Sequence, residues 1–201
     1  KFHKQIMDDL NTKLTNRADL LIKNAKQIEK SINKIAELVI RTIENKGKLM
    51  FCGNGGSAAE CQHMSAEYCA TLDHKRPRLG MSSISLTTDT SFITAWTNDF
   101  GYKDIFSRQL QTIGNEGDLL FCYSTSGNSL NVCEAAKEAR RKKITVVGLI
   151  GNHDKTKLAP FCDAIFISPS SDTPIIQEFH TIAGHEICSI VENEIFFKDE
   201  N

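Results

Sequence analysis

The sequence of 201 residues predicts an α/β fold with a parallel β-sheet, and two features of its hydrophobic pattern support this class. First, five apolar runs of about five residues each are continuous rather than alternating, which is typical of strands buried on both faces of a sheet. Second, segments with helical character separate these runs, and this alternation favours right-handed crossovers between parallel strands. The predicted strands are 48–52, 82–86, 117–122, 144–150 and 163–167. The predicted helices between and after them are 57–71, about 90–112, 128–142, a short 154–159 and 174–197.

The segment before the first strand is helical along nearly its whole length. Residues 4–46 are rich in Lys, Asn, Glu, Ile and Leu, and their apolar positions recur at helical spacing, so we predict two helices there. This is more helix than one small sheet requires, and we therefore expect residues 1–46 to pack against other subunits. No linker divides the chain, so 1–201 is predicted to be a single domain, with an α/β core in 47–201.

Composition narrows the class of protein. The 24 basic and 25 acidic residues give a net charge of −1, which argues against nucleic-acid or membrane-surface partners. The seven cysteines include no C-x-x-C pair and several lie in apolar runs, as expected of reduced thiols in the cytoplasm. No signal peptide is recognisable, and no apolar run approaches the roughly 20 residues that span a bilayer. We expect a cytoplasmic protein.

The first candidate site follows the first strand, where the sequence reads "GNGGSAAE" from Gly53 onward. Its glycines allow close approach of the backbone to a ligand, and Ser57 is a natural N-cap for the next helix. A helix N-terminus attracts phosphate, although a tight turn with a cap explains the same residues. The pattern is neither a dinucleotide-binding nor a Walker A loop, so no nucleotide cofactor is expected.

The second candidate site follows the third strand, where the sequence reads "STSGNS". Asn128 or Ser129 would cap the following helix, but capping accounts for only one hydroxyl. The group Ser124, Thr125, Ser126 and Ser129 can donate hydrogen bonds to phosphate oxygens without adding charge. Ligands of parallel sheets bind at the carboxyl ends of the strands, where both stretches lie. We predict a neutral phosphate-binding turn.

Two helices carry candidate metal ligands. His63 and Glu67 lie four residues apart on one helical face, and a His nitrogen with a carboxylate oxygen is a common half of a zinc site; a surface ion pair is the alternative. In the final helix, Gln177 and His185 are eight residues apart, which on ideal geometry is about 80° around the axis and some 12 Å along it. To share one metal they must lean together or come from different subunits.

Other polar residues near these motifs have less defined roles. Glu178 and His180 in the final helix are expected to face solvent or to contact the ligands rather than bind metal. Asn98 and Asp99, in "TNDFG", suit a polar turn, and local features leave their role open.

Taken together, "CGNGGS", "HxxxE", "TNDFG", "GDLLFCYSTSGNS" and "IQExHxxxxH" resemble the sedoheptulose 7-phosphate isomerases, or phosphoheptose isomerases, of bacterial heptose biosynthesis. The resemblance extends over nearly the whole chain, to about residue 197. It implies a SIS-type three-layer α/β sandwich with a five-stranded parallel sheet and N-terminal helices. It also implies a homotetramer with active sites at subunit contacts and one zinc ion per subunit.

The resemblance assigns roles to individual positions. Zinc would be bound by His63, Glu67, Gln177 and His185, with Glu67 and His185 as catalytic base and acid. We also expect Ser57, Glu67 and Gln177 to contact the substrate. The remaining positions that match substrate-binding residues of the family are Asn54, Gly55, Gly56, Asn98, Asp99, Ser124, Thr125, Ser126 and Ser129.

The implied reaction converts sedoheptulose 7-phosphate to D-glycero-D-manno-heptose 7-phosphate, a precursor of the lipopolysaccharide core. A proton rather than a hydride moves between C1 and C2, so no redox cofactor is needed. Thr71 and Ile175 stand where the family often has Arg, which leaves the sugar preference open.

The alternative is a non-enzymatic partner of the bacterial replication initiator with the same fold. That relative lacks a carboxylate matching Glu67, so Glu67 favours the enzyme. A sugar-phosphate-sensing regulator would need a DNA-binding domain, and no helix-turn-helix with a basic patch is evident.

Overall fold

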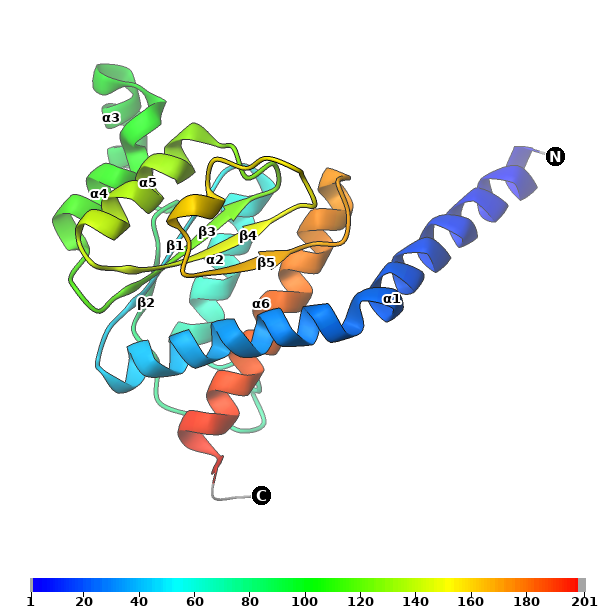
Figure 1. Cartoon of the computed structure of the whole chain (residues 1–201), viewed down its shortest axis with the longest axis horizontal. Coiled ribbons are helices and arrows are strands. Elements are labelled where there is room, and N and C mark those ends of the chain that lie inside the picture. The colour runs from blue at the N-terminus through cyan, green and yellow to red at the C-terminus, as the bar shows by residue number, and fades with distance from the viewer. Residues whose placement is uncertain (1, 199–201) are drawn as a thin grey trace.

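The computed structural model describes residues 2–198, and side chains from residue 9 onward. Five strands form one parallel sheet in the order β2-β1-β3-β4-β5 (Figure 1). They are β1 (Leu49–Gly53), β2 (Ser83–Ser85), β3 (Leu119–Ser124), β4 (Thr145–Ile150) and β5 (Ala164–Ile167). Each predicted strand is confirmed. The central strands β1, β3 and β4 are buried along nearly their whole length, as a continuous apolar run predicts, whereas the edge strands β2 and β5 are partly exposed.

Helices cover both faces of the sheet, which confirms the three-layer architecture (Figure 1). Alternate side chains of each strand point to opposite faces. Leu49 and Phe51 of β1 belong to the core beneath α1 (Phe2–Glu44), α2 and α6, whereas Met50 and Cys52 belong to the core beneath α4 and α5. The bounds are α2 (Gly56–Cys69), α4 (Ile105–Ile113), α5 (Leu130–Arg141) and α6 (Thr173–Phe196).

The N-terminal segment is one uninterrupted helix, α1 (Phe2–Glu44), so the prediction of two helices is wrong. No Gly or Pro occurs within it to end a first helix. The helix stops where the N–H of Gly47 bonds to the carbonyl of Thr42 at 2.8 Å and Lys46 adopts a positive φ of 62°. Periodicity identified the buried face here but not the point at which the helix ends.

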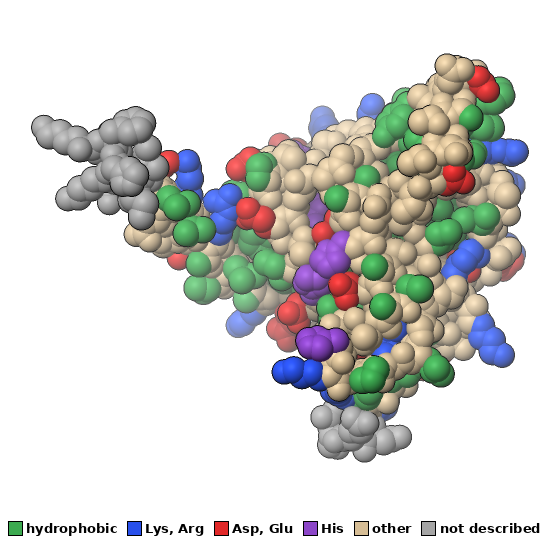
Figure 2. All heavy atoms as spheres, turned by 180° about the vertical axis from the view of Figure 1, so that it is seen from behind, with side chains coloured by type: hydrophobic (Ala, Val, Ile, Leu, Met, Phe, Trp, Pro, Cys, Tyr) green, Lys and Arg blue, Asp and Glu red, His purple; other side chains and the backbone are tan. Residues whose placement is uncertain are grey.

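The second half of α1 packs closely on the body of the molecule, where Ile32 and Val39 are buried, and contacts extend back to Leu20 and Arg17. The first half projects away from it (Figure 1). Apolar side chains line this projecting arm (Figure 2), and Leu14 and Ile22 are 57% and 73% exposed.

Two other predicted helices differ from the structure. The segment 90–112 is broken into α3 (Thr90–Phe100), a 3₁₀ turn η1 (Tyr102–Asp104) and α4, because Gly101 adopts a positive φ of 93°. The short helix expected at 154–159 is replaced by a 3₁₀ turn η2 (Ala159–Phe161). Among the described residues, no helix combines the length and apolarity needed to cross a membrane.

Candidate active site

The two glycine- and hydroxyl-containing turns lie side by side at one edge of the sheet. They follow β1 and β3, which are neighbours in register with Gly53 opposite Tyr123. The sheet order changes direction between these two strands, and the carboxyl edge at such a switch point is where open α/β sheets bind ligands. Two stretches far apart in the sequence therefore form one site.

The turn after β1 leads directly into α2. Gly55, with a φ of 57°, occupies the N-cap position and the helix begins at Gly56. The prediction that Ser57 is the N-cap is therefore wrong: Ser57 lies in the first turn, and its N–H bonds to the carbonyl of Asn54 at 3.0 Å. A helix start still leaves backbone N–H groups without intrahelical partners, which suits an anion.

The side chain of Asn54 is engaged in a structural contact. It exchanges two amide hydrogen bonds with Asn131, at 2.9 and 2.8 Å, and accepts a third from the hydroxyl of Tyr102 at 2.8 Å. Asn131 is buried at the start of α5, so this amide pair ties the first turn to the second. Asn131 and Tyr102 were missed in the sequence because their partner lies far away along the chain. Both acceptor sites of its Oδ1 are thus occupied, and a contact between Asn54 and substrate is left to the backbone or to the second N–H of Nδ2.

Four hydroxyl-bearing residues converge in the turn after β3. Ser124 is 2% exposed and donates to the hydroxyl of Ser129 at 3.0 Å. Ser126 is exposed, and its hydroxyl accepts from the N–H of Asn128 at 3.1 Å. The carbonyl of Thr125 accepts from a backbone N–H of the loop after β4. Ser129 holds the N-cap position of α5 as expected, yet its side chain makes no capping bond within the described structure. This hydroxyl is therefore not committed to the helix.

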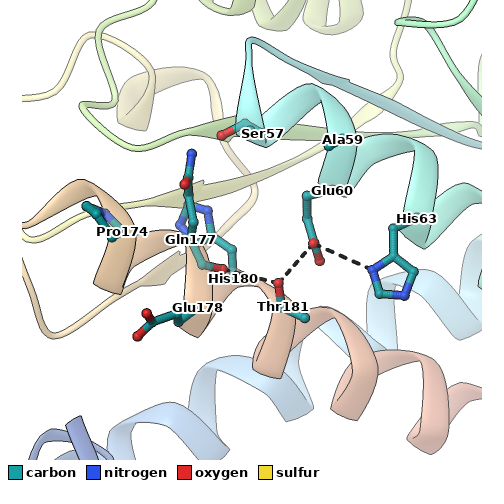
Figure 3. Close-up of a pocket in the computed structure, with 10 residues that line it drawn as sticks. Ser57, Ala59, Glu60, His63, Pro174, Gln177, Glu178, His180 and Thr181 are labelled. Carbon is teal, nitrogen blue, oxygen red and sulfur yellow. Dashed lines mark hydrogen bonds and ion pairs between the residues drawn. The ribbon is translucent and has the colours of Figure 1, made fainter. Parts of the chain in front are cut away.

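A cavity of about 510 Å³ opens between the start of α2 and α6 (Figure 3). Gln177 lies against the start of α2, where a Cβ added at Gly56 would come within 2.6 Å of its Nε2 atom. His63 lines the same cavity from α2, and in Figure 3 the Gln177 side chain points to the Ser57 end of that helix. Gln177 and His63 therefore line the same cavity, but no hydrogen bond joins their side chains in the described structure.

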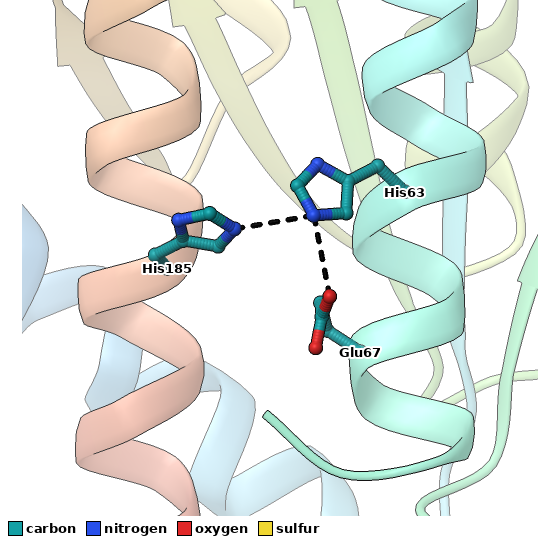
Figure 4. Close-up of side chains that lie close together, drawn as sticks. All are labelled: His63, Glu67 and His185. Atoms are coloured by element: carbon teal, nitrogen blue, oxygen red, sulfur yellow. Dashed lines mark hydrogen bonds and ion pairs between the residues drawn. The ribbon is translucent and has the colours of Figure 1, made fainter. Parts of the chain in front are cut away.

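His63, Glu67 and His185 form a cluster in which one ligand atom from each lies within 4.8 Å of the others (Figure 4). The Nε2 atom of His63 is 3.2 Å from Nε2 of His185 and 3.2 Å from Oε1 of Glu67. Tetrahedral zinc with ligands at 2.0–2.2 Å holds neighbouring ligand atoms roughly 3.3–3.5 Å apart, so the two separations from His63 are close to those of a zinc site, and all three ligand atoms lie within 4.8 Å. Three protein ligands leave a position for substrate or for a fourth ligand. The role of Gln177 as that ligand stays a prediction.

Glu60 lies next to His63 and is held by Thr181. Neither residue was predicted from the sequence to contribute to the site. Oε2 of Glu60 lies 3.7 Å from Nδ1 of His63 and accepts a hydrogen bond from Thr181 at 2.9 Å. A carboxylate facing Nδ1 favours the tautomer whose Nε2 lone pair can bind metal. The only sequence signal was the position of Glu60, three residues before His63 on the same helix.

Glu178 and His180 differ in exposure. Glu178 faces solvent at the cavity rim, where it forms an ion pair of 2.7 Å with Arg17 of α1. His180 is 1% exposed, with its ring edge-on to those of Tyr123 and Phe166. Burial lowers the pKa of His180 to about 4, so this histidine is neutral in the folded protein at pH 7.

Asn98 and Asp99 lie apart from the cavity. They occupy the last turn of α3 rather than a loop, are exposed, and bond to each other at 2.8 Å. Helix α3 lies with α4 and α5, away from α2 and α6 (Figure 1). A substrate contact by either residue stays a prediction.

Comparison with known proteins agrees with this geometry. Residues 14–151 match the family model of the SIS domain, so the chain is a SIS-domain protein. The phosphoheptose isomerase of Burkholderia pseudomallei is 46% identical over 168 residues, 84% of each chain. The solved phosphoheptose isomerase of Neisseria gonorrhoeae superposes with a TM-score of 0.85 at 34% identity, covering 94% of this chain and 99% of that one. That of Francisella tularensis gives 0.87 at 30% identity, with coverages of 93% and 98%.

The chain therefore belongs to the phosphoheptose isomerase family, which confirms the resemblance of the five motifs. Membership of this family makes it an aldose–ketose isomerase.

Proposed function

We propose that the chain interconverts sedoheptulose 7-phosphate and D-glycero-D-manno-heptose 7-phosphate, a step that supplies heptose for the bacterial lipopolysaccharide core. The observation that carries this proposal is the cluster of His63, Glu67 and His185, of which His63 lines the same cavity as Gly56 and Ser57 at the start of α2. The names of the relatives support the heptose phosphate as substrate.

The phosphate end of the sugar is held by the turn after β3 and by the start of α2. Ser126 is exposed and the hydroxyl of Ser129 is not used for capping, so both can reach phosphate oxygens. Binding energy from this distant group orients the reacting carbons. A neutral turn also lets the phosphorylated product leave without breaking ion pairs.

The metal site belongs to the reacting end. His63, Glu67 and His185 would hold one zinc ion per subunit, with Gln177 proposed as the fourth ligand. Bound zinc would act as a Lewis acid on a sugar oxygen, where negative charge develops during isomerisation.

Proton transfer is assigned to Glu67 and His185. Glu67 is the carboxylate of the cluster and is partly exposed, so it can take the proton from one carbon and return it to the neighbouring carbon. His185 would move protons between the sugar oxygens. Glu60, held by Thr181, keeps the imidazole of His63 oriented while this happens.

We also propose a homotetramer with its active sites at subunit contacts. Leu14 and Ile22 on the projecting half of α1 form an unpartnered apolar surface in the isolated chain, which suits burial against another subunit. At such a contact, the exposed Asn98 and Asp99 would have a route to a substrate.

The test combines metal analysis with turnover. Purified protein should contain zinc and should isomerise sedoheptulose 7-phosphate, with loss of activity on chelation and recovery on zinc addition. Zinc-loaded protein without isomerase activity would overturn the proposal and favour a partner-binding role.

A further inference from the structure

Arg78 forms a buried ion pair that no part of the proposed reaction uses. It lies in the loop 70–82 between α2 and β2, and its side chain is 1% exposed. Its Nη2 and Nε atoms lie 2.7 and 2.8 Å from Oε1 of Glu192 on α6, whose side chain is 4% exposed. A charge pair this deep is costly to desolvate, so its remaining hydrogen bonds matter.

Those hydrogen bonds go mainly to the end of α2. Arg78 donates from Nη1 to the carbonyls of Tyr68 and Ala70, at 2.9 and 3.0 Å, and from Nη2 to the carbonyl of Glu67 at 2.9 Å. A further bond holds the carbonyl of Leu79 in its own loop. The last carbonyls of a helix lack intrahelical partners and carry partial negative charge, so a guanidinium satisfies both their bonding and their charge.

The ion pair lies beside the metal-ligand cluster. Glu67, whose carbonyl Arg78 holds, supplies a ligand of the cluster from α2. Glu192 follows His185 by seven residues, about two helical turns, and so shares its face of α6. Arg78 therefore joins the two helices that provide the three ligands.

Two other contacts already join α2 and α6. Thr181 bonds to Glu60 at 2.9 Å before the cluster, and at its level a Cβ on Gly184 would lie 2.6 Å from the sulfur of Met64. The Arg78–Glu192 pair supplies the connection beyond the cluster, at the end of α2. Contacts on both sides of His185 therefore restrain the spacing of the two helices.

Metal binding is sensitive to that spacing. His63 and Glu67 share one helix, so their separation is set locally, whereas the 3.2 Å between His63 and His185 depends on the distance between helices. Protein ligands must lie within about 0.2 Å of ideal distances to hold zinc well.

We propose that Arg78 and Glu192 form an interhelical clamp that holds His185 in metal-binding register with His63 and Glu67. This inference rests on the proposed zinc-dependent function. Arg78 and Glu192 are positioning residues, because they touch the helices that carry the ligands rather than the metal or the sugar.

The test compares Arg78→Lys and Glu192→Gln with a matched control. Lys keeps the charge of Arg78 but loses the planar fork that joins four carbonyls and Glu192. Gln keeps the shape of Glu192 and an oxygen that can accept. The control is Asn193→Ala, because Asn193 accepts a hydrogen bond of 3.1 Å from Arg76 and so connects the same loop and helix at the surface.

The main measurement is zinc affinity, by competition with a chromogenic chelator on folded, metal-free protein. We expect affinity to fall about 10–100-fold in Arg78→Lys and Glu192→Gln, as for other residues that orient ligands, and to stay within about twofold in the control. With Co²⁺ at saturation, the d–d absorption bands of both variants should shift, which a loss of stability alone would not cause. Turnover should show a lower kcat with little change in KM, because the phosphate-binding turns follow β1 and β3, at the opposite end of α2 from the carbonyls that Arg78 holds.

Four results would overturn some part of this account. Wild-type zinc affinity and an unchanged Co²⁺ spectrum in both folded variants would contradict the proposed clamp but leave the metal site as proposed. Loss of the folded state in both variants would assign the pair to folding instead. An effect of equal size in the control would show a general loosening of the loop. Absence of zinc binding by the wild type would overturn the metal site itself, and the clamp's role with it.

Discussion

Glu67 has two proposed roles, because it is both the carboxylate of the metal-ligand cluster and the proposed base. Glu67→Gln keeps the shape of the side chain but removes its charge and its proton acceptor. We expect turnover to fall by roughly 10²–10⁴-fold, as is typical of an acid–base residue, and zinc to bind more weakly. Thermal unfolding should change little, because Glu67 lies on a partly exposed helical face.

Turnover assays, metal analysis and a sugar-phosphate binding assay on Glu67→Gln check this expectation. Glu186→Gln is the matched control, since Glu186 is exposed and adjacent to His185. Near-normal turnover by Glu67→Gln would show that the base is assigned wrongly, and His185 would be the next candidate.

His180 should make the stability of the protein depend on pH. Its pKa of about 4 in the folded state is below the usual 6.5, so between these values the unfolded chain binds the extra proton and stability falls as pH falls. From pH 7 to pH 5 this one residue should remove about 2 kcal/mol. His180→Leu should lose that part of the pH dependence.

The measurement is urea unfolding of metal-free protein at pH 7 and pH 5, for wild type, His180→Leu and the exposed control His74→Leu. For each protein we compare the change in the free energy of unfolding between pH 7 and pH 5. The contribution of the other histidines is common to wild type and variant and cancels in this comparison. The same pH dependence in all three proteins would contradict a neutral, buried His180.

At the scale of elements, the sequence predicts apolar faces better than it predicts ends. The central strands β1, β3 and β4 could be predicted because burial on both faces dictates a continuous apolar run. The end of α1, the first residue of α2 and the break at Gly101 depend on the φ angles of single residues in three-dimensional context. The period of a hydrophobic pattern does not contain that information.

In the candidate site, too, the sequence predicts local features but not the contacts between distant residues. The hydroxyl turn and the His63–Glu67 pair are local in sequence, so their chemistry was visible. The hydrogen bond from Thr181 to Glu60 and the one from Asn54 to Asn131 join residues that lie far apart along the chain. Such partners emerge only when helices pack, which is why the residues supporting the site were missed.

A substitution at the start of α2, Gly56→Ala, tests whether Gln177 is a zinc ligand without disrupting the fold. A Cβ at Gly56 would come within 2.6 Å of the end of the Gln177 side chain, which is flexible and can move aside. Gly56 lacks the positive φ of Gly55, so Ala fits its backbone. We expect Gly56→Ala to unfold at the wild-type temperature or above, yet to show weaker zinc binding and lower turnover because Gln177 is displaced. Calorimetry with metal and activity assays would check this, and full activity would remove Gln177 from the site.

At the scale of the whole molecule, one sheet order gathers the site. Placing β1 beside β3 brings two turns together, and the packing of α6 against α2 adds Gln177 to the cavity and His185 to the cluster with His63 and Glu67. Histidine and acidic side chains gather accordingly near the centre of one face of the molecule (Figure 2). The projecting half of α1 is the part of the fold that this arrangement does not use.

That projecting half should hold the subunits together. Leu14 and Ile22 are exposed in the single chain, whereas the fully buried residues of α1 begin at Ile28, so changing these two side chains leaves the domain core intact. Leu14→Lys with Ile22→Lys should therefore yield a smaller species by light scattering, with an unchanged circular dichroism spectrum. Activity should fall together with assembly, because the proposed active sites lie at subunit contacts. Lys30→Ser, an exposed change on the same helix, should leave size and turnover as they are. A fully active monomer would contradict shared sites, and an intact tetramer would show that α1 is not the surface that holds it.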